Sequence, residues 1–142
     1  MKILHTADWH LGTFRSPVKD GVNLRTEDTK RCLNEMIRVA GEERPDYSLV
    51  SGDIFHSGKT WSDRCCEEIV TATHYIKELA AVSKQVVVMR GTPNHDGIGL
   101  FNVLAQTFEP FPNVHIVITP QVIPFEDVDI ALIPGFDRGI FR

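Results

Sequence analysis

The sequence lacks the features of a fibrous, disulfide-rich or membrane-spanning chain. It has only three cysteines in 142 residues, and an odd number does not suit a disulfide framework. Its hydrophobic runs are short, as at Val86–Met89, and fall far below the ~20 residues that a membrane span needs. The opening segment, Met1–Asp8, carries an early acid and has the form of neither a signal peptide nor a transit peptide. We therefore expect one globular domain in a reducing, cytoplasmic setting, with no membrane contact.

The chain also lacks an excess of positive charge. Fifteen lysines and arginines stand against nineteen acidic residues, which gives a formal net charge of −4. Nucleic-acid binders usually carry a basic patch, but bound divalent cations can supply positive charge where a phosphate sits. The apolar share of 42% and the charged share of 24% are ordinary for a globular protein. The composition therefore leaves a metal-dependent nucleic-acid enzyme open.

The hydrophobic pattern predicts strands and helices that alternate along the chain. A loop is expected over residues 8–25, and an oxygen-bearing residue opens each of the first two helices, at Thr26 and Thr60. The unbroken β-branched run at Val86–Met89 predicts a strand buried on both faces. The β-α-β-α-β order is typical of a parallel α/β sheet. The predicted strands are Lys2–Ala7, Tyr47–Ser51, Val86–Met89, His115–Thr119, Gln121–Ile123 and Val128–Ile133, with a short helix near Leu100–Thr107.

Polar side chains follow the first three predicted strands. The carboxyl ends of parallel strands meet at one edge of a sheet, which is the usual ligand site in an open α/β fold. We therefore expect these side chains to lie together there. They are Asp8, His10, Asp53, His56, Asn94 and His95.

These residue types suit a divalent metal site. In extended backbone, the spacing of Asp8 and His10 puts both side chains on the same side, and a carboxylate with an imidazole can hold a borderline ion. Asp53 adds a carboxylate whose two oxygens could bridge two ions, and Asn94 adds a carbonyl oxygen. His95 can move a proton near neutral pH. Each motif alone is common in turns, but three in this order favour a metal centre.

Asp-X-His, Gly-Asp and Asn-His-Asp in this order resemble the calcineurin-like metallophosphoesterases. Two longer stretches, residues 1–12 (MKILHTADWHLG) and 52–58 (GDIFHSG), are similar to the nuclease subunit of SbcCD-type DNA double-strand-break repair complexes. The resemblance implies a metallophosphoesterase sandwich, in which helices flank a largely parallel sheet. It also implies that residues 1–142 form the N-terminal part of a nuclease domain.

The resemblance further implies roles for the residues at the strand ends. Asp8 and His10 would bind one ion, Asp53 would bridge two ions, and Asn94 would bind the second. The ions are commonly manganese in this family. His95 would act as the proton donor, and His56 would help to steer the phosphate. The implied reaction is exo- or endonucleolytic hydrolysis of DNA in repair or recombination, with an SMC-like ATPase subunit as partner and a homodimer left open.

The sequence departs from the family pattern in two places. Thr92 and Pro93 separate Gly91 from Asn94, whereas the family usually has glycine directly before the asparagine. The family completes its site with three further histidines, one of them alone and two in a Gly-His-X-His motif. After His95 the chain has only His115. We therefore expect an incomplete sandwich, weak metal binding, and poor or no DNA cleavage by the isolated chain.

Two other functions remain open at this point. The chain could belong to a different metallophosphoesterase that acts on nucleotides. It could also be a non-catalytic interaction module that keeps part of the site. A nicking assay with manganese and a panel of nucleotide esters would separate these functions from a DNA nuclease.

Overall fold

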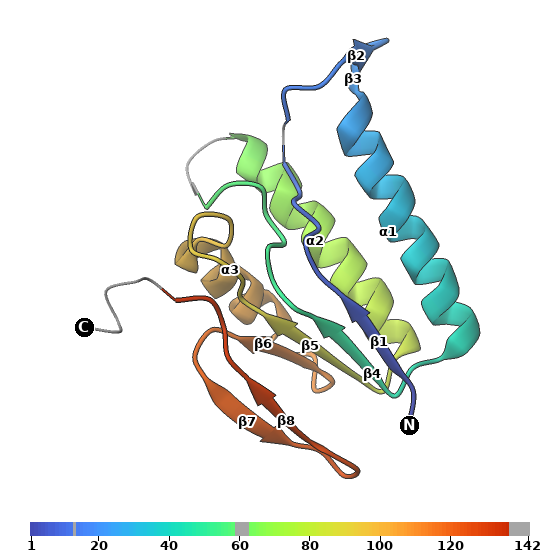
Figure 1. Ribbon diagram of the computed structural model, residues 1–142, viewed down its shortest axis with the longest axis vertical. Helices are drawn as coiled ribbons and strands as arrows, with labels where there is room; N and C mark the ends of the chain where they lie inside the picture. Colours follow the sequence, from blue (N-terminus) through green and yellow to red (C-terminus); the bar gives the residue numbers. More distant parts are fainter. Residues whose placement is uncertain (13, 59–62, 137–142) are drawn as a thin grey trace.

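A parallel four-stranded sheet lies at the centre of the computed structural model. The structure describes residues 1–12, 14–58 and 63–136, without the side chains of residues 63–66. The order of strands across the sheet is β1-β4-β5-β6, and all three neighbouring pairs are parallel (Figure 1). The sheet strands are β1 (Ile3–Thr6), β4 (Tyr47–Val50), β5 (Gln85–Met89) and β6 (Val114–Val117).

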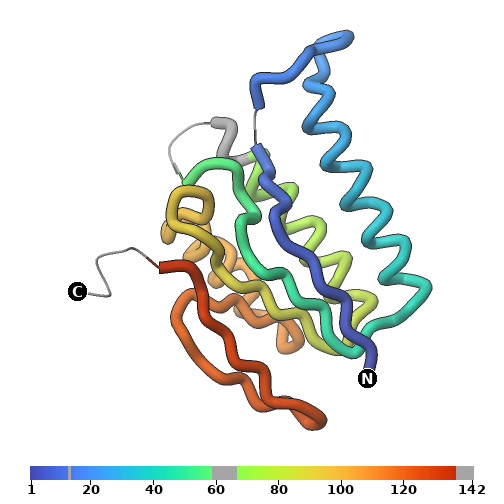
Figure 2. The backbone as a smooth tube through the Cα atoms, viewed as in Figure 1, coloured from blue at the N-terminus to red at the C-terminus, as the bar shows by residue number. Residues whose placement is uncertain are grey.

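Helices and a hairpin cover opposite faces of this sheet. Val86 and Val88 of β5 pack into the core cluster shared with the helices, whereas Val87 between them packs into a second cluster with residues of the hairpin. The prediction that this strand is buried on both faces is therefore confirmed. The tube view shows the hairpin in front of the sheet and the helices behind it (Figure 2). These elements are helices α1 (Leu24–Glu43), α2 (Asp63–Val82) and α3 (Ile98–Phe108), and hairpin strands β7 (Gln121–Pro124) and β8 (Asp129–Leu132).

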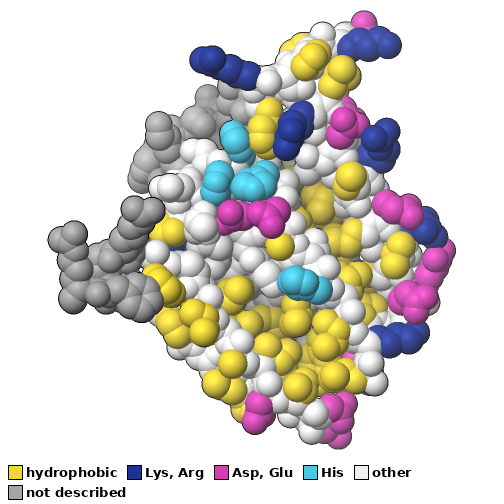
Figure 3. Space-filling model, in the orientation of Figure 1, with side chains coloured by type: hydrophobic (Ala, Val, Ile, Leu, Met, Phe, Trp, Pro, Cys, Tyr) yellow, Lys and Arg dark blue, Asp and Glu magenta, His cyan; other side chains and the backbone are white. Residues whose placement is uncertain are grey.

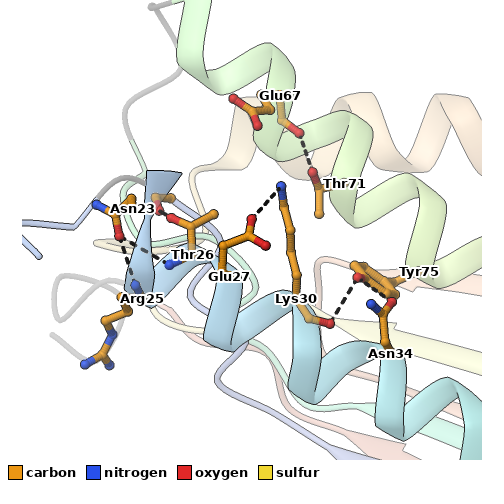
Figure 4. Close-up of polar contacts among 10 residues, drawn as sticks. Asn23, Arg25, Thr26, Glu27, Lys30, Asn34, Glu67, Thr71 and Tyr75 are labelled. Carbon is orange, nitrogen blue, oxygen red and sulfur yellow. Dashed lines mark hydrogen bonds and ion pairs between the residues drawn. The ribbon is translucent and has the colours of Figure 1, made fainter. Parts of the chain in front are cut away.

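The first helix begins two residues before the predicted start at Thr26. Asn23 is the N-cap, and its side-chain oxygen accepts hydrogen bonds from the backbone N–H groups of Arg25 and Thr26 (Figure 4). Asparagine is among the best N-cap residues because its oxygen satisfies N–H groups that the helix leaves free. The prediction of a Thr26 start was therefore wrong. The segment predicted as loop also holds a short antiparallel hairpin, β2 (Val18–Lys19) with β3 (Val22–Asn23).

The second helix packs against the first through both apolar and polar contacts. Its buried stripe includes Ala72, Ile76 and Leu79, at the spacing expected for one face of a helix. The Tyr75 hydroxyl donates to the side-chain oxygen of Asn34 in α1 at 2.9 Å (Figure 4). The predicted start at Thr60 lies outside the described residues. None of the described helices is both long and apolar enough to cross a bilayer.

Candidate metal centre

The loops after β1 and β4 are joined by backbone hydrogen bonds, and this joins the first two polar motifs. The Asp8 N–H donates to the Gly52 carbonyl, and the His10 N–H donates to the Asp53 carbonyl, both at 3.0 Å. Leu11 then forms an isolated parallel bridge with Phe55. The pairing of β1 with β4 thus continues past the ends of the strands, and it brings the Asp8–His10 motif beside Asp53.

The backbone of this site is in the left-handed region at three residues that are not glycine. The φ angles are 56° at Asp8, 46° at His10 and 50° at Asp53. The extended backbone expected between Asp8 and His10 was therefore wrong. The two side chains still converge, with His10 Nε2 3.4 Å from Asp8 Oδ1, because the left-handed residues redirect them. Such conformations cost about 1–3 kcal/mol each and gather at functional sites.

Two glycines allow the third loop to approach the second. A side chain on Gly52 would overlap the backbone of Gly91, and a side chain on Gly91 would overlap the backbone and carboxylate of Asp53. Gly52 also has a φ of 89°, which a residue with a Cβ adopts at a steric cost. Glycine at both positions lets the loop that follows β5 lie directly against Asp53.

Thr92 and Asp96 hold this third loop in place. The Thr92 backbone N–H and hydroxyl both donate to Asp53 Oδ1, at 2.6 and 2.9 Å. Asp96 is fully buried, and its carboxylate accepts from the N–H groups of Phe55 at 3.1 Å and Gly91 at 2.7 Å. Burial raises the pKa of the Asp96 carboxyl, although these hydrogen bonds act in the opposite direction. No sequence pattern predicted that Thr92 contacts Asp53. Asp96 could be recognised only as the last residue of the Asn-His-Asp motif.

Three histidines meet beside the carboxylates. The ring centroids of His10 and His95 are 4.6 Å apart, and His56 lies 6.2 Å from each. Figure 3 shows histidine side chains gathered next to acidic ones on one face of the molecule. The ring of Phe14 packs on His56 at 4.1 Å between centroids. Burial, and then the charges of His10 and His95, lower the pKa of the His56 imidazole.

A hydrogen bond fixes which nitrogen of His95 is available. His95 Nδ1 lies 2.8 Å from the backbone carbonyl of His56. A carbonyl oxygen can only accept, so Nδ1 carries the hydrogen. The Nε2 atom of the neutral ring therefore has the free lone pair.

A cavity of about 340 Å³ opens next to His10, between the first two helices. Its wall includes Phe14, Thr26 and the carboxylate-bearing Glu67 and Glu68. Burial, and then the charge of Glu67, raise the pKa of Glu68. With Glu27, the wall holds three glutamates against one lysine, Lys30, so a phosphate near His10 would be repelled unless further cations lie beside it.

The described residues fit a divalent metal ion. Ligand atoms of Asp8, His10 and Asp53 lie within 4.8 Å of one another, and so do ligand atoms of His10, His56 and His95. The His10 Nδ1 atom is buried without a hydrogen-bond partner in the described part of the chain, although buried polar nitrogens are nearly always satisfied. Imidazole and carboxylate together are the donors that borderline divalent metals prefer.

Of the six predicted site residues, five are brought together by these contacts. Asn94, the sixth, lies in the same loop as His95. Its side chain is exposed, and its backbone carbonyl accepts from the Gly58 N–H at 2.8 Å. The ligand roles of all six residues, and the catalytic roles of the two histidines among them, stay predictions.

Comparison with known proteins identifies the family of this chain. The family described as calcineurin-like phosphoesterase matches residues 1–136. The SbcD subunit of the nuclease SbcCD from Staphylococcus epidermidis is 28% identical over 109 residues, which cover 77% of this chain and 26% of that relative. The chain thus aligns with about a quarter of the relative's length. The resemblance and the α/β fold class predicted from the sequence are confirmed: this chain belongs to the calcineurin-like phosphoesterase family.

Proposed function

We propose that residues 1–142 form the N-terminal part of a nuclease domain that hydrolyses phosphodiester bonds in DNA with divalent metal ions. One observation carries the proposal. Asp8, His10 and Asp53 converge at the carboxyl ends of parallel strands in a chain that belongs to the calcineurin-like phosphoesterases. The similarity to an SbcCD nuclease subunit favours DNA over other phosphoesters.

Asp8 and His10 would hold one Mn²⁺ ion, Asp53 would contact two, and Asn94 would contribute an amide oxygen to the second. Such ions neutralise phosphate charge and lower the pKa of water, so that water becomes an effective nucleophile. Thr92 supports this arrangement because its two hydrogen bonds hold Asp53 Oδ1 in one place.

His95 would transfer a proton to the leaving oxygen. Its Nδ1–H donates to the His56 carbonyl, so Nε2 is the atom that exchanges a proton with the substrate. His95 must therefore be in its imidazolium form to donate from Nε2. His56, held against Phe14, would donate a hydrogen bond to a phosphate oxygen.

The similarity to a subunit of a nuclease complex supports a proposal for the wider setting. We propose an SMC-like ATPase as partner, a role in DNA repair or recombination, and a cytoplasmic location. The free, exposed thiol of Cys32 suits a reducing compartment, whereas the side chains of Cys65 and Cys66 lie outside the described residues. We also leave a homodimer open, in which a second copy of the chain would supply further metal ligands.

A single-turnover assay tests the proposed activity, because excess protein makes slow cleavage measurable. We expect slow cleavage of end-labelled DNA that requires Mn²⁺, stops with a chelator and is lost in Asp53→Asn. Hydrolysis of nucleotide esters without cleavage of DNA would instead identify a nucleotide-directed phosphoesterase. Metal binding without hydrolysis of either substrate would identify an interaction module. The first result overturns the nuclease proposal, and the second overturns it for residues 1–142 acting alone.

A further inference from the structure

The cluster contains one residue that belongs to two different groups of ligands. His10 contributes a ligand atom to the group with Asp8 and Asp53, and it also contributes one to the group with His56 and His95. The other four side chains thus divide into an oxygen pair, Asp8 and Asp53, and a nitrogen pair, His56 and His95. One imidazole has one free lone pair when neutral, so His10 serves one group at a time.

The two groups differ in the metal that they suit. Two carboxylates and one imidazole favour a hard or borderline ion such as Mn²⁺. Three neutral imidazoles with one open position are a ligand set found for Zn²⁺. Co²⁺ has the same ligand preference as Zn²⁺, and its visible absorption reports the coordination geometry of the site.

The nitrogen group is positioned before any metal binds. The His95 Nδ1–H donates to the His56 carbonyl at 2.8 Å, and a hydrogen bond of this kind commonly orients a metal-ligating histidine. His56 is also held in place. Its backbone N–H donates to the Leu11 carbonyl at 2.8 Å, and its ring packs on Phe14. Among the described residues, His10 Nδ1 has no hydrogen-bond partner. Three nitrogens around tetrahedral Zn²⁺ lie about 3.3 Å apart, and the ligand atoms of the three histidines lie within 4.8 Å of one another, so Zn²⁺ would draw them closer together.

We infer that His10, His56 and His95 form a second, nitrogen-only site for Zn²⁺ that competes with the carboxylate site for His10. Zn²⁺ in this site would remove His10 from the Mn²⁺ group and would occupy His56 and His95 at the same time. Zn²⁺ would therefore inhibit hydrolysis even with Mn²⁺ in excess. Only this last consequence rests on the proposed nuclease function.

Metal binding to the purified chain tests the inference without any assay of activity. We expect Co²⁺ to give the strong visible bands of a four-coordinate site, which Zn²⁺ then displaces. Zn²⁺ affinity, measured by competition with a chromophoric chelator, should fall at least ~10-fold in His56→Gln and in His95→Gln, because each loses one of three protein ligands. Asp53→Asn should change Zn²⁺ affinity by less than about threefold while it weakens Mn²⁺ binding.

His74→Gln is the matched control, because His74 is an exposed histidine of α2 whose ring packs beside Tyr75, away from the cluster. It should leave Zn²⁺ affinity unchanged, and circular dichroism should show the same fold in every variant. The inference is overturned if Asp53→Asn weakens Zn²⁺ binding as much as His56→Gln does. It is also overturned if Co²⁺ shows a thiolate charge-transfer band or only weak octahedral bands. Loss of Mn²⁺-dependent cleavage alone would contradict the proposed function and leave the Zn²⁺ result standing.

Discussion

Strand β4 has an aspartate just before it and another just after it, and the two have opposite surroundings. Asp46 lies 2.5 Å from the ammonium group of Lys84 and 3.8 Å from the N-terminal ammonium, and it accepts the Lys2 N–H at 2.7 Å. Asp53 accepts two neutral hydrogen bonds from Thr92. Among the described residues it has no ion pair with lysine or arginine, and Asp8 lies close by.

The difference supports the proposal that a bound cation belongs beside Asp53 and not beside Asp46. The hydrogen bond from Lys84 holds the pKa of the Asp46 carboxyl below its usual value, so this carboxylate is already matched inside the fold. Two carboxylates that lie together without a cation repel each other. Asp46 therefore serves the structure at the amino ends of the strands, whereas we propose that Asp53 at the carboxyl ends binds a metal ion.

The largest expected effect comes from replacing each of these two aspartates by asparagine in separate variants. Asp53→Asn should weaken Mn²⁺ binding at least ~100-fold, since the loss of a ligand exceeds the loss of a supporting hydrogen bond, and should abolish DNA cleavage. Asp46→Asn should leave both unchanged and lower the free energy of unfolding. Calorimetric titration and urea unfolding measure the two quantities. Equal effects of both substitutions on Mn²⁺ binding would remove the distinction between the two ends.

The second prediction separates chemistry from metal binding within the site. His95→Gln should slow single-turnover cleavage by about 10²–10⁴-fold, the usual share of a general acid, and should leave Mn²⁺ affinity within about threefold. His74→Gln is the control and should change neither. If His95→Gln loses Mn²⁺ as badly as Asp53→Asn does, His95 is a Mn²⁺ ligand and the proton-donor role is wrong.

The third prediction concerns the close contact of the loops. Gly91→Ala should lower the free energy of unfolding by about 1–3 kcal/mol, because the new methyl group meets the backbone and carboxylate of Asp53. A methyl group at Gly41 in α1 has open space around it, so Gly41→Ala should instead raise stability by about 0.5–1 kcal/mol. Urea unfolding of both variants gives the comparison. A neutral Gly91→Ala would mean that the loop after β5 is not held against Asp53.

The smallest effect is the pH dependence that Asp46 contributes. Its pKa is lowered in the folded state, so its stabilisation is present above its unfolded pKa of about 3.9. It is lost as the pH falls through the lower folded value. Asp46→Asn should therefore flatten the acid limb of stability against pH, measured by urea unfolding between neutral pH and pH 3. An unchanged acid limb would show that Lys84 does not hold Asp46 in solution.

The sequence predicted the sheet better than the connections. Unbroken apolar runs such as Val86–Met89 set the strands, and their alternation with helices sets a parallel order. The β2–β3 hairpin has strands of two residues, which is too short for any periodicity to show. Thr26 and Asn23 have similar capping chemistry, so only the structure could show which one the helix uses.

The members of the candidate site could be predicted because polar residues gather after successive strands. Their conformation could not, since aspartate and histidine enter the left-handed region more readily than most residues but do not signal it. The support from Thr92 was hidden as well. Its contact with Asp53 spans 39 residues of sequence and depends on a loop path that only the close approach of Gly52 and Gly91 allows.

Anomalous diffraction from crystals soaked in Mn²⁺ would test the central claim most directly, because it locates the ion without relying on activity. We predict a peak at the carboxyl ends of the strands, within bonding distance of Asp8, His10 and Asp53, and none beside Asp46. A peak at Asp46, or a peak at the strand ends that Asp53 does not contact, would contradict the account.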